Sequence, residues 1–139
     1  MLPNNLNSKK KLYSQIYRIL ERVTPLKSDC GLLCNKACCD GGDEDLGMYL
    51  FPGEELLLSD LRYFRITPTD IQLKNGSIVL LANCDGKCDR THRPLACRIF
   101  PLTPYLTYRR TLTLEMDIRA VGTCPLANRK NAPPLHPDF

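Results

Sequence analysis

The chain has no tryptophan, few aromatic residues and no long apolar run. It has 139 residues, and no apolar stretch approaches the roughly 18 residues that a membrane-spanning helix needs. The lack of tryptophan, together with eleven prolines, predicts a loop-rich fold. The first residues, MLPNNLNSKKKLYS, include basic side chains but no apolar stretch and cleavage site after them. We therefore expect no signal peptide and no membrane partner, and we interpret the protein as cytoplasmic.

An excess of charge of one sign is also missing. Nineteen Lys and Arg residues against fifteen Asp and Glu residues leave a net charge of +4. This falls short of a strongly basic nucleic-acid binder, so no nucleic acid is expected as a partner. The hydrophobic fraction of 43% and the charged fraction of 24% are ordinary for a folded protein of one domain.

Cysteine, by contrast, is abundant. The segment DCGLLCNKACC, residues 29–39, holds four cysteines, and CDGKCDRTHRPLAC, residues 84–97, holds three more. In a reducing compartment such clustering indicates metal binding or catalysis more often than disulfides. Inert buried thiols remain an alternative, above all for Cys124, which stands alone in the sequence. The predicted metal ligands are Cys30, Cys34, Cys38, Cys39, Cys84, Cys88, Cys97 and Cys124.

The spacing of the first cluster leaves the number of sites open. Cys30, Cys34 and Cys38 are four residues apart, so helical turns would align them, and a loop with this spacing could wrap a soft ion. The side chains of the adjacent Cys38 and Cys39 diverge, so either each belongs to a different site or one is not a ligand. The two clusters with Cys124 supply enough thiolates for two four-sulfur sites, or for one site and spare thiols.

Several familiar metal motifs are absent. Zinc and iron–sulfur clusters both accept four thiolates, but the CxxC knuckle of zinc fingers does not occur, and CGLLCNKAC differs from the CxxxCxxC of radical S-adenosylmethionine enzymes. The acidic loop DGGDEDLG does not match an EF-hand. His92 could be a nitrogen ligand, although an exposed loop histidine is the simpler interpretation, and His136 is assigned no role.

Hydrophobic periodicity predicts two helices. The first covers residues 8–23, begins at a Ser8 N-cap and places Leu12, Ile16, Ile19 and Val23 on one face. The second is a short helix in FPGEELLLSDLRYF that starts at proline and carries Leu57, Leu61 and Phe64 on one side.

Alternation and turn signals predict the strands. IQLKNGSIVLLANC has the pattern of a β-hairpin with Asn75-Gly76 at its turn. Leu112, Leu114, Met116 and Ile118 alternate with other residues, which indicates a further half-buried strand. The fold class is therefore α+β: a small single domain whose loops are held together by cysteine–metal ligation. It divides into an N-terminal helix and linker (1–27), a cysteine-cluster domain (28–128) and a loose tail (129–139).

Five motifs together resemble a known family. They are DCGLLCNKACC, MYLFPGEE, CDGKC, HRPLACRIFPLTPY and DIRAVGTCPLA, and they look like those of the YkgJ-type cysteine-cluster proteins. The family label CxxCxxCC is not met literally, because this chain has CxxxCxxxCC. The resemblance covers residues 28–128 and implies a zinc- or iron-chelating domain. That domain is shared with flagellin lysine N-methylases, in which an iron–sulfur cluster takes part in methyl transfer to lysine.

These observations favour an iron–sulfur cluster, such as 4Fe-4S, over zinc. The expected role is redox chemistry or methyl transfer to a protein lysine, with a protein as partner or substrate. A zinc-stabilised protein-interaction module and a metal carrier without catalysis are the alternatives. Arg98, which follows Cys97 in ACRIFP, is expected to be buried and to donate hydrogen bonds to cysteine sulfurs or to Asp117, and Arg93 is a second supporting cation.

Overall fold

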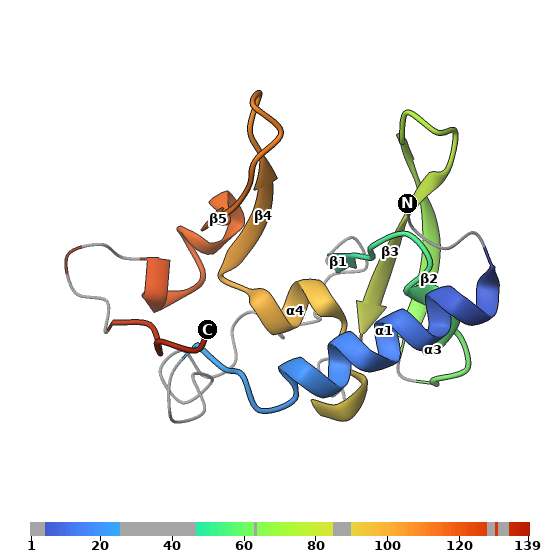
Figure 1. The fold of residues 1–139 in the computed structure, drawn as a ribbon, viewed down its shortest axis with the longest axis horizontal. Helices are drawn as coiled ribbons and strands as arrows, with labels where there is room; N and C mark the ends of the chain where they lie inside the picture. The colour runs from blue at the N-terminus through green and yellow to red at the C-terminus, as the bar shows by residue number, and fades with distance from the viewer. Residues whose placement is uncertain (1–4, 26–46, 63, 85–89, 128–129, 131–133) are drawn as a thin grey trace. The chain divides into compact units, whose positions relative to one another are not determined.

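The computed structural model describes residues 5–25, 47–62, 64–84, 90–127, 130 and 134–139. In this part of the chain it has three α-helices and two antiparallel sheets, so the predicted α+β class is confirmed (Figure 1). No helix in these ranges combines the length and apolarity needed to cross a bilayer. The elements are α1 (Leu6–Leu20), β1 (Met48–Tyr49), α3 (Glu55–Leu58), β2 (Phe64–Gln72), β3 (Ile78–Cys84), η2 (Arg90–His92), α4 (Leu95–Ile99), β4 (Leu102–Leu106), β5 (Leu112–Met116), η3 (Ile118–Ala120) and η4 (Pro125–Ala127).

The chain forms two compact units. The first contains Met1–Arg22 and Cys39–Ala96, and the second contains Val23–Cys38 and Cys97–Phe139. The core of the first unit is built from Tyr17, Leu50, Leu58 and Ala82. Partly buried apolar side chains pack against this core, namely Leu57, Leu61, Phe64, Ile66, Leu80 and Leu95.

Helix α1 begins two residues before the predicted helix and ends at Leu20, three residues before the predicted end. The side chain of Asn5, rather than that of Ser8, caps it by accepting a hydrogen bond from the backbone N–H of Asn7 at 3.0 Å. The buried face also differs, because Tyr13 and Tyr17 are buried while Ile19 is 72% exposed. Each tyrosine buries its ring while its hydroxyl donates a hydrogen bond. The spacing of aliphatic residues in the sequence does not predict that these tyrosines are buried.

Helix α3 is much shorter than predicted. It covers Glu55–Leu58, after Gly53 has turned the chain with a positive φ of 93°. Leu58 is completely buried, and Phe64, expected on the same helix, instead begins strand β2. The β-branched residues that follow Phe64 favour an extended chain, so Phe64 belongs to the strand rather than to the helix.

The hairpin prediction is confirmed. Strands β2 and β3 pair antiparallel on either side of Asn75-Gly76, and Gly76 adopts the positive φ of 86° that this turn requires. Asn75 Oδ1 accepts a hydrogen bond from the backbone N–H of Ser77 at 3.0 Å. Strand β1 pairs with the other edge of β3, so β3 is the central strand of a three-stranded sheet, in the order β1-β3-β2.

The second unit contains the other hairpin. Strands β4 and β5 pair antiparallel, from Leu102 opposite Met116 to Leu106 opposite Leu112 (Figure 1). The predicted strand at 112–118 is thus confirmed as far as Met116, whereas Ile118 starts η3 and is 85% exposed. The expectation that this strand is half-buried on its apolar side is wrong, because Leu112 and Leu114 are 69% and 55% exposed.

Candidate functional site

Three of the eight predicted ligands belong to the described residues. Cys84 is the last residue of β3, Cys97 is the third residue of α4, and Cys124 directly precedes η4. All three are half-buried thiols and do not form disulfides. The remaining predicted ligands lie outside the described residues, and these are Cys30, Cys34, Cys38, Cys39 and Cys88.

Cys84 is positioned by the central strand. It stands opposite Phe64 of β2, and Ala82, two residues earlier, stands opposite both Ile66 of β2 and Met48 of β1. At Leu81 and Ala82 the central strand β3 pairs with a neighbour on each side, and at Cys84 it pairs with β2. Cys84 therefore lies at the paired end of β3, where the second cysteine cluster begins in the sequence.

Cys124 is positioned by two successive 3-10 turns. Its backbone N–H donates to the Ala120 carbonyl at 2.8 Å, and its carbonyl accepts from the Ala127 N–H at 3.0 Å. The preceding turn begins at Asp117, which is 5% exposed and accepts a hydrogen bond from the backbone N–H of Arg119 at 2.9 Å. The Arg119 guanidinium also binds this carboxylate, at 2.5 Å from Nη2 to Oδ2, and this pairing lowers the pKa of Asp117 below its usual value.

Helix α4, which carries Cys97, is anchored at its first residue by Glu54. The side chain of Glu54 is completely buried, and its Oε1 accepts a hydrogen bond from the Leu95 backbone N–H at 2.5 Å. The same oxygen accepts from the Tyr17 hydroxyl, and Oε2 accepts from the Phe51 backbone N–H at 3.1 Å. One carboxylate thus joins α1, the turn before α3 and the start of α4.

Glu54 is not among the site residues predicted from the sequence. The available signal was LFPGEELLL, in which two glutamates follow a Pro-Gly turn inside an otherwise apolar run. A charged residue between buried leucines either turns toward solvent or finds hydrogen-bond donors in the interior. The second case applies to Glu54, whereas Glu55 accepts a hydrogen bond from the Gly53 N–H at 3.0 Å in the same turn.

The Glu54 carboxylate also affects Tyr13. The hydroxyl of this tyrosine donates to the Pro52 carbonyl at 3.0 Å, next to the turn that holds Glu54 and Glu55. Burial first, and then the negative charges of Glu54 and Glu55, raise the pKa of Tyr13 from 10.0 to about 12. Tyr13 therefore stays neutral and remains a hydrogen-bond donor across the physiological range.

The expected burial of Arg98 is confirmed, since this residue is only 6% exposed on α4, directly after Cys97. The expected pairing of Arg98 with Asp117 stays a prediction, and the Asp117 carboxylate forms an ion pair with Arg119. Arg93 is half-buried just before α4. The roles of both arginines at a metal site stay predictions.

The two histidines are placed as follows. His92 ends η2 and is half-buried, which differs from the exposed loop position expected for it. His136 donates its backbone N–H to the Pro25 carbonyl at 2.7 Å, and its Nδ1 accepts from the Asp138 N–H at 3.2 Å.

Within the described ranges, no group of three His, Cys, Asp or Glu side chains gathers closely enough to hold a metal ion. Five of the eight predicted ligands lie outside those ranges, so the metal site stays a prediction. The chain matches no protein-family model, no curated protein and no solved structure. The resemblance to the YkgJ-type family therefore rests on the quoted motifs alone.

Proposed function

We propose that this protein is a cytoplasmic cysteine-cluster metal-binding protein whose resident group is an iron–sulfur cluster. The observation that carries the proposal is the grouping of seven of its eight cysteines into two short segments. The state of the three described cysteines supports it, because each is a half-buried thiol at the end of, or within, a hydrogen-bonded element. The backbone hydrogen bonds of these elements fix where each cysteine lies along the chain.

The donor set fits the proposed group. Thiolate is the ligand that iron–sulfur clusters and structural zinc sites share, and no nitrogen or oxygen ligand is needed to complete four positions. Four thiolates around either group leave about two negative charges, which are costly in a small domain unless cations lie nearby. Arg98 is buried and follows Cys97 in sequence, so it would supply such a cation. When bound, the cluster would supply electron transfer or take part in methyl transfer, as the family resemblance implies.

Anaerobic purification tests the proposal directly. We expect iron and acid-labile sulfide in stoichiometric amounts, with broad visible absorption that bleaches on chemical reduction. Chelation or oxidation should remove the colour and expose thiols to titration, because bound thiolates are protected from the reagent. A colourless protein without metal, in which all eight thiols titrate freely, would contradict the metal-binding proposal as a whole.

A second candidate is a zinc-stabilised protein-interaction module with no reaction of its own. The observation that favours it is the exposed apolar hairpin β4–β5, since exposed apolar surface commonly marks a protein-binding site. This candidate predicts one or two zinc ions, no visible absorption, and loss of folding on chelation. A metal carrier instead predicts exchangeable binding, with metal lost during gel filtration while the fold is kept.

A further inference from the structure

The β4–β5 hairpin has one face made only of apolar side chains. Residues paired across an antiparallel ladder point to the same side, and alternate pairs share a face. The pairs Thr103–Glu115 and Tyr105–Thr113 therefore form one face. The opposite face is formed by three pairs, which are Leu102–Met116, Pro104–Leu114 and Leu106–Leu112.

This apolar face is exposed, and most strongly so near the tip of the hairpin. Leu102, Pro104 and Met116 at its base are half-buried. Nearer the tip, the exposed fractions are 55% for Leu114, 64% for Leu106 and 69% for Leu112. Contiguous exposed apolar side chains of this kind cost free energy in water and are typical of a surface that a partner covers.

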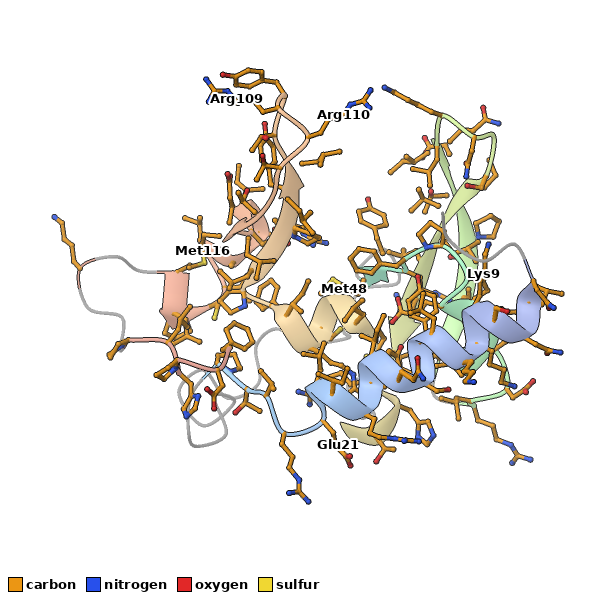
Figure 2. All side chains as sticks on the ribbon, viewed as in Figure 1. Lys9, Glu21, Met48, Arg109, Arg110 and Met116 are labelled. Carbon is orange, nitrogen blue, oxygen red and sulfur yellow. The ribbon has the colours of Figure 1, made fainter. Side chains whose placement is uncertain are left out.

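The tip adds positive charge to the end of the apolar face. Arg109 and Arg110 lie there, while Met116 lies at the base (Figure 2). Tyr108 is 88% exposed, and the Arg109 guanidinium lies over its ring, 5.4 Å from the centroid. Among the described residues, neither arginine forms an ion pair with a carboxylate. The tip therefore offers two guanidinium groups to an acidic partner.

We propose that this face binds a segment of another protein that combines apolar side chains with a carboxylate at one end. Charge complementarity with Arg109 and Arg110 requires the acidic end at the tip. A second copy of this chain fits poorly when the tips meet, because four guanidinium groups would come together. Insertion of the hairpin into the hydrocarbon core of a bilayer is unfavourable, because β4 and β5 form a two-stranded sheet in the described residues and lipid cannot satisfy the N–H and C=O groups along its edges.

The dimensions of the face define the segment further. Leu102 to Leu106 is four residue steps, or about 14 Å at roughly 3.4 Å per residue. An extended segment with apolar side chains at three alternate positions covers that length. An Asp or Glu one or two residues beyond the last apolar position then reaches the arginines. The proposal concerns surface recognition and holds for either metal in the cysteine site.

Selection from a random peptide library displayed on phage, with the full-length protein as bait, tests this recognition. We expect enrichment of peptides with apolar residues at alternate positions and an acidic residue at one end. A synthetic peptide of the enriched sequence should lose roughly tenfold or more in affinity for the Leu112→Ser/Leu114→Ser variant, because two apolar contacts are removed. Arg109→Gln/Arg110→Gln should weaken binding several-fold at low salt and make the remaining binding less dependent on salt.

Ile71→Ser is the matched control, since Ile71 is a 43% exposed apolar residue on β2 of the other hairpin and should leave binding unchanged. Circular dichroism checks that the Leu112→Ser/Leu114→Ser variant folds. If this variant does not fold, the Arg109→Gln/Arg110→Gln variant tests the proposal by itself. The proposal is overturned by an absence of enrichment or by enriched peptides without acidic residues. It is also overturned if the peptide binds the Arg109→Gln/Arg110→Gln variant and the wild-type protein equally well. It is also overturned if the same leucines instead mediate binding to phosphatidylserine vesicles or dimerisation in sedimentation experiments.

Discussion

Replacing Glu54 with alanine should be among the most destabilising single substitutions in the first unit. The Glu54 side chain is completely buried and accepts hydrogen bonds from the Tyr17 hydroxyl, the Phe51 N–H and the Leu95 N–H. Each buried donor that loses its acceptor costs about 1–3 kcal/mol. Removing the carboxylate also removes its desolvation cost, which offsets part of the loss. We therefore expect Glu54→Ala to lower the free energy of unfolding by about 3–5 kcal/mol, a large share of the roughly 5–15 kcal/mol of a typical domain.

Graded variants separate the contributions of these hydrogen bonds. Glu54→Gln keeps one acceptor oxygen and should cost less than alanine, whereas Tyr17→Phe removes a single donor and should cost about 1–2 kcal/mol. In a double-mutant cycle, the cost of Tyr17→Phe should nearly disappear when residue 54 is already alanine, because the shared hydrogen bond is then absent. Glu54→Ala also removes the acceptor of the Leu95 N–H at the start of α4, so hydrogen exchange at the Leu95 amide should become faster.

Urea unfolding followed by circular dichroism near pH 7 measures these differences. Glu115→Ala serves as the control, since Glu115 is an exposed glutamate on β5 and its loss should change stability by less than about 0.5 kcal/mol. If Glu54→Ala unfolds within about 1 kcal/mol of the wild type, the hydrogen bonds of the buried carboxylate do not stabilise the first unit and the reasoning fails.

Three other predictions concern the cysteine site and pH. Cys34→Ser or Cys88→Ser should lower both metal content and melting temperature, because structural metal ligation can contribute on the order of 10 kcal/mol to folding; a variant that loses metal but melts like the wild type would contradict this. Arg98→Gln should retain metal roughly tenfold less well in a chelator competition than the control Arg109→Gln, because Arg109 lies at the exposed hairpin tip. Equal metal retention in the two variants would exclude Arg98 from the site. The pKa of Tyr13, raised from 10.0 to about 12 in the folded protein, implies stability that is present below pH 10 and is lost as the pH rises toward 12. Tyr13→Phe should flatten this alkaline decline in urea unfolding measured at successive pH values, and an unchanged slope would show that another group causes it.

The sequence alone was enough to place those elements whose signals are local. The Asn75-Gly76 turn was predictable because only a few residue types accept positive φ, and the flanking β-formers are close in sequence. The strand at 112–116 and the existence of the first helix followed from periodicity. The burial of Arg98 was also predictable, from its position between the apolar residues of ACRIFP.

The tertiary structure decided which faces are covered. Periodicity identified a helix at 8–23 but assigned its buried side to aliphatic residues, whereas the partners available across the core select Tyr13 and Tyr17. Alternation identified the β5 strand, yet alternation carries no information about whether a neighbour exists to cover the apolar side. Leu112 and Leu114 are exposed, and their exposure is visible only once β4 and its surroundings are in place.

Glu54 is the clearest example of a residue whose role depends on the tertiary structure rather than on a local sequence pattern. Its two oxygens accept hydrogen bonds from the Phe51 N–H, three residues earlier, and from groups 37 and 41 residues away in sequence. A local pattern can place a glutamate after a Pro-Gly turn, but it cannot show that Tyr17 and the start of α4 converge on it. That convergence depends on the packing of α1 and α3. Burial of the carboxylate costs free energy, and hydrogen bonds from these distant donors offset that cost.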